Sequence, residues 1–301
     1  MKKRLHIIGV LAICISAISW GLDGVVLTPQ LYNLDTSLVV FLLHFIPFMI
    51  MNLFLFKEYK HIKKFTKDDF ITFSLIAIFG GALGTLAIVK ALFLVKFNHL
   101  SVIILLQKLQ PVFAIILASI LLKEKIGKRF ILWASIAIIA SYFLAFGFHV
   151  PQFSSDNLAQ AALWSLLAAF SFGSATVFGK KMLNRYSFHT TTFYRFGFTS
   201  LFMLVFTAIT GTIFNIPQVT PFNWLIFLII AFTTGCGAIF LYYYGLNKVK
   251  AIISTICELC FPVSTIIFDY LINGTVLSLI QWISAIIMVT SIIMISKGKK
   301  E

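Results

Sequence analysis

The chain has 301 residues, of which 60% are hydrophobic and 11% are charged, and its formal net charge at pH 7 is +14. A soluble domain is about 45–50% apolar and about 25% charged, so too few charged residues are present here to cover a water-facing surface. This composition excludes a soluble enzyme and an intrinsically disordered chain. Because the hydrophobic stretches are long enough for transmembrane helices rather than for barrel strands, we expect an all-α integral membrane protein.

Ten hydrophobic segments of about 20 residues follow one another, and only short connectors separate them. The first segment passes through Trp20 and Asp23 without a clear small-residue cleavage site, so we interpret it as a retained helix rather than a signal peptide. In chain order the segments are 6–27, 37–56, 70–94, 100–122, 130–148, 158–179, 188–210, 222–246, 251–272 and 276–296.

The basic residues lie in clusters between the hydrophobic segments, which is typical of membrane orientation signals and argues against nucleic-acid binding. Twenty of the 24 Lys and Arg residues lie at the two termini and in the connectors after the second, fourth, sixth and eighth segments. The other connectors hold only Lys96. Since Lys and Arg concentrate on the cytoplasmic side, this pattern predicts ten helices with both termini in the cytoplasm, in the inner membrane of a bacterium.

The four cysteines all lie inside hydrophobic segments, so a disulfide framework is not indicated. Cys257 and Cys260 have the spacing of a metal or redox pair. They lie in one membrane segment without a second pair or a nearby His, and we therefore expect neither a metal nor a cofactor.

The two halves of the sequence resemble each other. Ser19-Trp20-Gly21 returns as Ser171-Phe172-Gly173, and the stretch 107–112 returns as 258–263, in each case 151 or 152 residues later. Each half holds five segments, so the second half enters the membrane from the opposite side. This pattern predicts two inverted five-helix repeats, as in secondary transporters that alternate access around a site at mid-membrane. The two halves are residues 1–149 and 150–301.

The end of the first half carries a family resemblance. Residues 105–114 (LLQKLQPVFA), followed by Glu124 at the helix end, resemble the end of the EamA repeat of the drug/metabolite transporter superfamily. The stretch 19–21 resembles the opening of that repeat. The resemblance spans the chain twice and implies a ten-helix transporter of small metabolites with its pathway between the halves. Thr275 stands where Glu124 stands in the first half, so any pairing made by that Glu is not expected in the second.

Ionisable groups inside a membrane span cost about 2.5–3.5 kcal/mol on insertion scales, and they normally face a partner or a watery cavity. Glu258 lies on one polar face of its segment with Thr255, Pro262, Thr265 and Asp269. We expect Pro262 to kink the helix and to free the carbonyl of Glu258, an arrangement that suits a cation or an amine. The alternative is a helix–helix contact in which the carboxyl group is neutralised.

Further candidates lie in four other segments. The amides of Gln107 and Gln110 can bind a solute, and Lys108 can hold an anionic group or pair with Glu258. Trp20 and Asp23 can form part of a cage for a cation. Arg195 is either a clamp for a carboxylate or phosphate or the partner of Asp23 or Glu258, and at least one ring of Tyr242, Tyr243 and Tyr244 should point inward. The predicted substrate-binding residues are Trp20, Asp23, Gln107, Lys108, Gln110, Arg195, Tyr244 and Glu258, and Glu258 and Asp23 are the candidates for proton coupling.

These features favour a secondary transporter, an exporter of small polar organic metabolites that works by alternating access as a monomer or a homodimer in the lipid bilayer. Because basic and acidic groups in the spans nearly balance, amino acids or related zwitterions are the first candidates. Organic cations, choline-like amines and sulfonium or nucleotide-linked metabolites are the alternatives. A membrane-embedded enzyme needs a cluster of catalytic groups, and the sequence has no HExxH, GxSxG or paired His motif. A channel or sensor is disfavoured by the twofold repeat within one chain.

Overall fold

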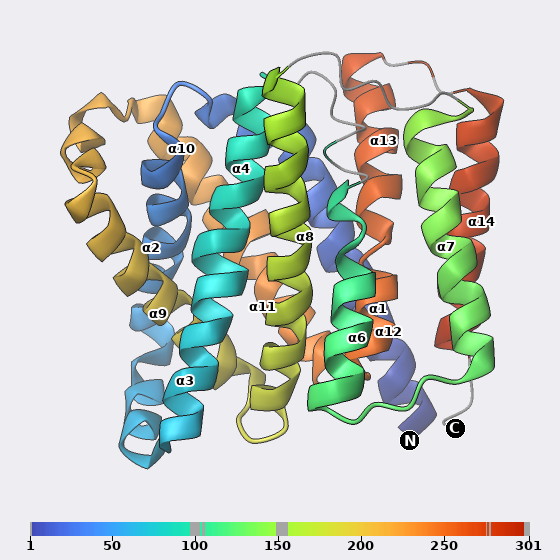
Figure 1. The fold of residues 1–301 in the computed structure, drawn as a ribbon. Coiled ribbons are helices and arrows are strands. Elements are labelled where there is room, and N and C mark those ends of the chain that lie inside the picture. The colour runs from blue at the N-terminus through green and yellow to red at the C-terminus, as the bar shows by residue number, and fades with distance from the viewer. Residues whose placement is uncertain are drawn as a thin grey trace.

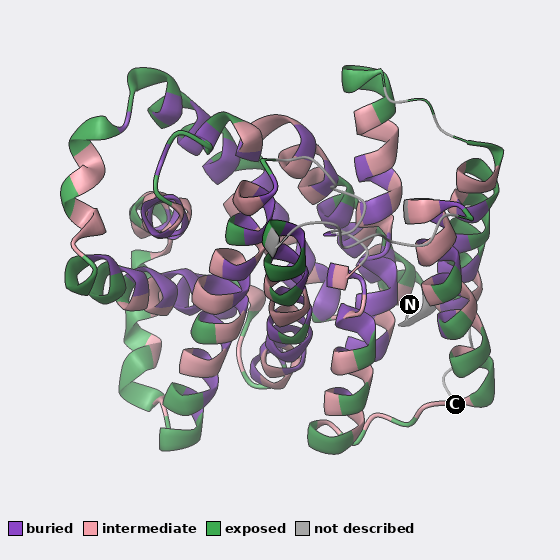
Figure 2. Ribbon diagram, turned by 45° about the horizontal axis from the view of Figure 1, so that its top comes forward, coloured by how far each residue is buried: buried purple, intermediate pink, exposed green. Residues whose placement is uncertain are grey.

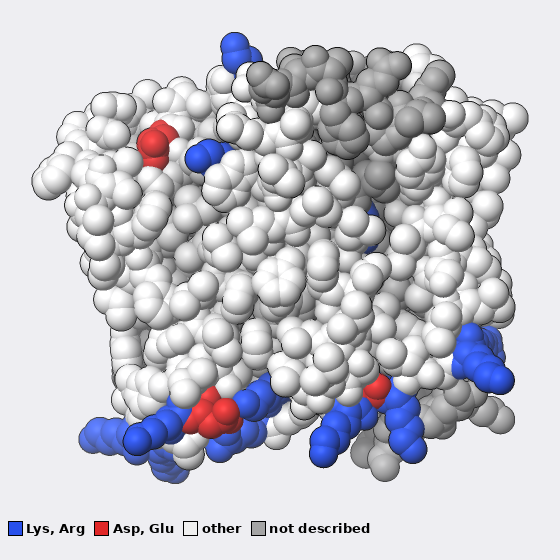
Figure 3. All heavy atoms as spheres, in the orientation of Figure 1, with Lys and Arg blue, Asp and Glu red and all other residues white. Residues whose placement is uncertain are grey.

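The computed structural model describes residues 2–96, 103, 106–148, 156–274, 276 and 278–297. Within these residues every regular element is helical, as the sequence predicts (Figure 1). The described ends of the chain, at Lys2 and Lys297, lie at the same end of the bundle, and most of the Lys and Arg side chains visible in Figure 3 gather at that end. We call it the basic end. The start of the segment 100–122, the junction of the two halves at 149–150 and Thr275 lie outside the described residues.

The main helices follow one another along the chain with short connections. The α-helices are α1 (Lys2–Leu22), α2 (Thr36–Leu55), α3 (Lys67–Leu75), α4 (Gly84–Leu94), α6 (Gln110–Leu121), α7 (Lys128–Phe146), α8 (Asp156–Leu183), α9 (Phe188–Ile209), α10 (Pro221–Ile230), α11 (Cys236–Leu246), α12 (Ala251–Cys257), α13 (Cys260–Asn273) and α14 (Leu279–Ser296). Short π-helical or 3₁₀ segments extend them: η1 (Asp23–Leu27), η2 (Thr28–Leu31), η3 (Phe56–Lys64), η4 (Ile76–Leu83), η5 (Thr212–Gln218) and η6 (Ala231–Gly235).

Eight helical segments among the described residues are long and apolar enough to cross a membrane. Each coincides with one of the ten predicted segments, and the remaining two predictions correspond to α6 and to α7. Large apolar side chains such as those of Leu53, Ile209 and Phe214 are exposed, which is expected of a surface that faces lipid. Buried residues turn toward the interior of the bundle (Figure 2). The eight segments are Arg4–Leu31, Thr36–Lys64, Lys67–Leu94, Asn157–Leu183, Phe188–Ile209, Pro221–Leu246, Ala251–Asn273 and Leu279–Ser296.

Irregular turns occur at matching places in the two halves. The π-helical turns η4 and η6 lie between α3 and α4 and between α10 and α11. A second break precedes α6 at Lys108 and Leu109, and its counterpart separates α12 from α13 at Glu258 and Leu259. A proline follows each of these breaks within three residues. Proline lacks the N–H group that would continue the helical hydrogen bonding, so it explains why the helix is interrupted there. Such discontinuous membrane helices are typical of transporter binding sites.

The prediction of an unpaired carbonyl at Glu258 is wrong. This carbonyl accepts a hydrogen bond from the backbone N–H of Phe261, at 3.0 Å. The chain tightens after Glu258, so the residue three positions later replaces the donor that Pro262 cannot supply. The polar group available at this break is therefore the carboxylate of Glu258 and not its backbone.

Two glycines allow the first helix of each half to approach a broken helix of the other half. α1 packs against α13, and α8 packs against α6. A Cβ atom at Gly21 would lie 2.1 Å from Oγ of Ser264 and 2.9 Å from the backbone nitrogen of Thr265. A Cβ atom at Gly173 would lie 2.8 Å from the carbonyl oxygen of Gln110. Small residues permit such close packing in membranes, and here they interlock the two halves.

Glu124 joins the two halves near the basic end. Its two carboxylate oxygens accept hydrogen bonds from the backbone N–H groups of Ala251 at 2.9 Å and Ile252 at 3.0 Å. These N–H groups begin α12 and have no partner within that helix. A carboxylate at a helix N-terminus also interacts favourably with the helix dipole. The Glu at the end of the first repeat therefore caps a helix of the second.

Replacing Glu124 with Ala is expected to destabilise the protein by about 1.5–3 kcal/mol, because hydrogen bonds to a charged group are lost and two backbone donors are left unpaired. The measurement is the thermal unfolding midpoint of the purified protein in detergent. Lys125→Ala, at an exposed neighbouring position, is the control and should leave the midpoint unchanged. Equal midpoints for the two variants would contradict this role of Glu124.

The basic end is also held together by ion pairs between α3 and the region where α8 ends. The Nζ atom of Lys181 lies 2.7 Å from a carboxylate oxygen of Asp68, and Nη1 of Arg185 lies 2.6 Å from one of Asp69. The hydroxyl group of Tyr186 donates a hydrogen bond to Asp69 at 2.9 Å. These contacts connect the third helical segment of the first half to the second half at this end.

Candidate substrate site

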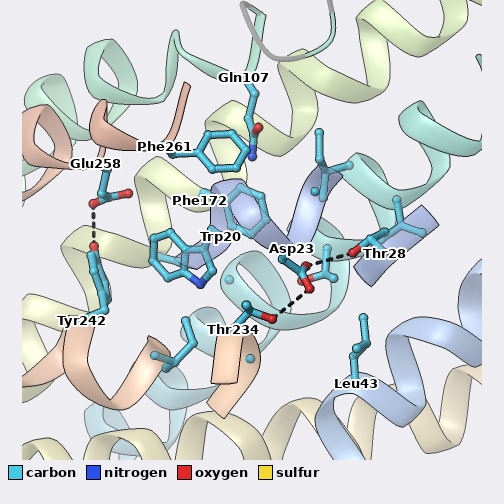
Figure 4. A pocket seen from close by; sticks show the side chains of 18 of the residues that line it. Trp20, Asp23, Thr28, Leu43, Gln107, Phe172, Thr234, Tyr242, Glu258 and Phe261 are labelled. Carbon is cyan, nitrogen blue, oxygen red and sulfur yellow. Dashed lines mark hydrogen bonds between the residues drawn. The ribbon is translucent and has the colours of Figure 1, made fainter. Parts of the chain in front are cut away.

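A cavity of about 240 Å³ lies between the two halves (Figure 4). Its walls come from α1, α2, α4, α6, α8, α9, α10, α11 and α13, from η1, η2, η4 and η6, and from the two helix breaks described above. The volume is just below the range of about 300–1,000 Å³ for pockets that enclose drug-sized ligands. The aromatic residues in its wall are Trp20, Phe172, Phe196, Tyr242 and Phe261, and the polar residues are Asp23, Thr28, His44, Thr85, Gln107, Lys108, Gln110, Thr176, Arg195, Thr234 and Glu258.

The structure brings seven of the eight predicted substrate-binding residues to this cavity. They are Trp20, Asp23, Gln107, Lys108, Gln110, Arg195 and Glu258. The eighth, Tyr244, is not in the cavity wall: its ring packs against Phe188 with ring centroids 5.4 Å apart, and Nζ of Lys248 lies 3.2 Å from its centroid. Tyr242, two positions earlier, takes the inward place. Three successive tyrosines cover nearly all faces of a helix, so their sequence alone does not select one.

Glu258 is the centre of a buried hydrogen-bond network. Its carboxylate accepts hydrogen bonds from Nε2 of Gln110 at 2.5 Å and from the hydroxyl groups of Tyr242 at 2.8 Å and Ser254 at 3.3 Å. The Tyr242 hydroxyl also lies 2.8 Å from Oγ1 of Thr176. The network connects α6 of the first half to α8, α11 and the α12–α13 break of the second. Glu258 makes no ion pair among the described residues.

Lys108 and Gln107 are less completely paired. The Nζ atom of Lys108 lies 3.6 Å from the ring centroid of Phe261, and within the described ranges Lys108 has neither a hydrogen bond nor an ion pair to a carboxylate. The predicted alternative pairing with Glu258 is therefore not formed. The Oε1 atom of Gln107 is buried and has no hydrogen-bond partner in the described part of the chain. Both side chains lie at the break that precedes α6.

Asp23 is held by two threonines at the turn after α1. Its carboxylate accepts hydrogen bonds from Thr28 at 2.9 Å and from Thr234 at 2.8 Å. Thr234 belongs to η6 of the second half, so this carboxylate also connects the halves (Figure 4). The side chain of Trp20 lies between Asp23 and Glu258 in the same view, and its ring centroid is 5.4 Å from that of Tyr242.

Arg195 lies deep in the wall and is held by neutral groups. Its Nη2 donates a hydrogen bond to the carbonyl oxygen of Gly80 at 2.7 Å, and Nη1 donates to the hydroxyl group of Tyr243 at 3.2 Å. The predicted alternative partners, Asp23 and Glu258, make no ion pair with it among the described residues. The Nε atom has no hydrogen-bond partner within the same residues.

Several cavity residues were not predicted from the sequence. Phe172 is the repeat equivalent of Trp20, and that correspondence is a signal that could have identified it. Phe261 follows Glu258 by three positions and so shares its helix face. Thr28 and Thr234 carry no such signal, because single threonines are common in membrane helices and only the fold brings these two to Asp23.

Broken helices from two halves, packed around a cavity with aromatic and polar walls, define a helical transporter of small molecules. The chain belongs to the EamA-like transporter family, which matches it twice, over residues 7–146 and 159–297. It is therefore a multi-pass membrane transporter and not an enzyme. The resemblance to the drug/metabolite transporter superfamily noted in the sequence is confirmed.

The chain is also similar to a named transporter over nearly its whole length. It is 55% identical to the riboflavin transporter ImpX of Fusobacterium nucleatum subsp. nucleatum over 294 residues, which cover 97% of this chain and 98% of the relative. A solved crystal structure superposes on it with a TM-score of 0.73 over 99% of each chain at 12% identity. At that identity the second likeness concerns the fold alone.

Proposed function

We propose that this protein transports riboflavin or a closely related flavin across the membrane. The observation that carries the proposal is the 55% identity to a riboflavin transporter over 97% of the chain. The cavity supports it, because Trp20, Phe172 and Phe261 supply aromatic faces on which a planar heteroaromatic ring system can stack. Its amide, hydroxyl and ammonium groups suit the ring carbonyls and the hydroxyl groups of a ribityl chain.

The seven predicted residues that line the cavity are proposed to contact the substrate, together with Tyr242. Glu258 and Asp23 are proposed to couple transport to protons. Each is a buried or partly buried carboxylate whose hydrogen-bond donors come from neutral side chains. A carboxylate in such surroundings can bind a proton without breaking an ion pair.

The balance of charges in the spans predicts an amino acid as the first candidate substrate. The hydrogen bonds in the cavity favour a flavin instead. An α-ammonium group would have to displace donors that already occupy the oxygens of Glu258 and Asp23. Among the alternatives, nucleotide-linked metabolites are nearer to a flavin, because they also carry a planar heteroaromatic ring.

The proposed mechanism is alternating access by two inverted five-helix halves, residues 1–149 and 150–301, with ten membrane helices in total. The basic end is proposed to face the cytoplasm of a bacterium, because Lys and Arg concentrate on that side of the inner membrane. The contacts of Asp23, Glu258 and Gln110 join the halves across the cavity. Rocking of one half against the other would exchange these contacts and open the cavity to either side.

The proposal predicts riboflavin counterflow in proteoliposomes. Vesicles loaded with unlabelled riboflavin should accumulate a trace of labelled riboflavin above the level of protein-free vesicles. Vesicles loaded with a mixture of amino acids should not accumulate a trace of labelled amino acid. Exchange of amino acids without exchange of riboflavin would overturn the proposal and restore the first expectation. Because counterflow does not depend on the direction of transport, riboflavin release from loaded cells then tests the predicted export.

A further inference from the structure

We propose that Gln107 and Lys108 form the subsite that binds the imide edge of the flavin ring system, the O=C–NH–C=O group of its pyrimidine ring. This inference rests on the proposed function and deepens it. It assigns the part of the cavity that selects the heterocycle, whatever the length or charge of the chain attached to the ring. The ligand class it defines is a planar heteroaromatic cyclic imide.

The first observation is an incompletely bonded amide in the cavity wall. Gln107 is 9% exposed, and its Oε1 atom has no hydrogen-bond partner among the described residues. A buried acceptor without a partner is unfavourable, so a protein interior rarely keeps one without a purpose. Figure 4 shows the amide of Gln107 directed toward the rings of Phe261 and Phe172. Because the last torsion of a Gln side chain is soft, its oxygen or its NH₂ group can turn toward a ligand.

The second observation is the neighbouring ammonium group. Nζ of Lys108 lies 3.6 Å from the centroid of the Phe261 ring, and no carboxylate within the described ranges pairs with it. The residue is 6% exposed and lines the same cavity. The helix break at Lys108 and Leu109 explains why two consecutive side chains both reach the cavity, since a regular helix would direct them about 100° apart.

The donor and acceptor pattern of these two side chains matches an imide. An imide offers one N–H donor between two carbonyl acceptors. The Gln107 amide can accept from the N–H group and donate to one carbonyl, and Lys108 can donate to the other. The Phe261 ring beneath the ammonium group supplies an apolar surface beside this edge.

The other charged groups of the cavity are less suited to this role. The oxygens of Glu258 and Asp23 already accept hydrogen bonds from the protein. Arg195 uses both terminal nitrogens on Gly80 and Tyr243, and its Nε atom, although unpartnered within the described residues, can only donate. A ligand N–H group therefore finds a better acceptor at Gln107 than at these three charged groups.

The test compares lumiflavin with 3-methyl-lumiflavin, in which a methyl group replaces the imide hydrogen. Each compound displaces labelled riboflavin from the purified full-length protein in equilibrium dialysis. The wild-type protein is expected to bind lumiflavin at least about tenfold more tightly, which corresponds to about 1.4 kcal/mol, the size of one hydrogen bond. In Gln107→Ala this ratio should fall to about threefold or less. In Lys108→Met both compounds should weaken by the same factor, because both keep their carbonyl groups.

Gln160→Ala is the matched control, since Gln160 is exposed on α8 outside the cavity, and it should keep the wild-type ratio. Equal binding of the two compounds by the wild-type protein overturns the subsite, and this result does not depend on any variant folding. The subsite is also overturned if Gln107→Ala leaves the ratio of the affinities for lumiflavin and 3-methyl-lumiflavin unchanged. If the wild-type protein binds neither riboflavin nor lumiflavin, the proposed function itself fails, and the two failures are thereby distinguished.

Discussion

Replacing Glu258 with Gln is expected to abolish riboflavin accumulation driven by a pH gradient while the protein still folds. The amide has the size of the carboxyl group and can keep a hydrogen bond with Tyr242, whose hydroxyl group both donates and accepts. It cannot carry a proton. Because Glu258 receives donors from both halves, its protonation would weaken the contacts that hold the cavity in one state. The measurement is accumulation in proteoliposomes with and without an imposed pH gradient.

Counterflow without a gradient is expected to be reduced but not abolished in the same variant, since exchange needs no net proton movement and the amide keeps the size of the carboxyl group. Asp269→Asn is the matched control, because Asp269 lies in the same helical segment but outside the cavity wall and accepts a hydrogen bond from Asn273. It should accumulate riboflavin normally. Gradient-driven accumulation by Glu258→Gln at the wild-type level would exclude this carboxylate as the coupling group. A large drop in its thermal midpoint would instead assign Glu258 a structural role.

The second large effect is expected at the glycines that interlock the halves. Gly21→Ala and Gly173→Ala each add one carbon atom where backbone atoms of the facing helix lie 2.9 Å and 2.8 Å away. Those atoms cannot rotate aside, so the helices must separate. Overpacking of this kind typically costs about 1–3 kcal/mol. We expect a lower thermal midpoint for both variants and reduced counterflow, because α13 and α6 carry the cavity wall.

Gly24→Ala is the control for this pair, because a Cβ atom at Gly24 would meet nothing within 4 Å. Alanine favours a helix over glycine by about 1 kcal/mol, so this variant should keep or raise the midpoint. The different outcomes at two glycines of the membrane segment Arg4–Leu31 separate a packing effect from a general effect of the substitution. A rise at all three positions would contradict the interlocking contact.

Much of the architecture could be predicted because membranes impose simple rules. The backbone must satisfy its own hydrogen bonds in lipid, so long apolar stretches become helices. Eight predicted segments coincide with helices long enough to span a membrane, and the two stretches matched by the repeat, 107–112 and 258–263, each contain a helix break. The count of ten spans and the orientation of the termini stay predictions. The free carbonyl at Glu258 was predicted wrongly, because a tight turn supplied a donor that regular helix geometry does not.

The candidate site was predicted largely from the free-energy cost of placing polar side chains inside a membrane. Ionisable and amide groups are expensive in a membrane unless they face a partner or a cavity, and seven residues selected for that reason line one cavity. Their partners were not predictable. Lys108 lies over Phe261 rather than against Glu258, and Arg195 is held by Gly80 and Tyr243 rather than by a carboxylate.

The sequence by itself determined that this protein is a helical membrane transporter with an internal repeat, because hydrophobicity, charge placement and motif spacing are properties of the linear chain. The tertiary structure decided which polar groups are satisfied by the protein and which remain available to a ligand. Hydrogen bonds extend only about 3 Å, so small differences in helix rotation and approach choose Tyr242 over Tyr244 and bring Thr234 to Asp23. Such differences depend on packing between distant segments, which no local pattern records.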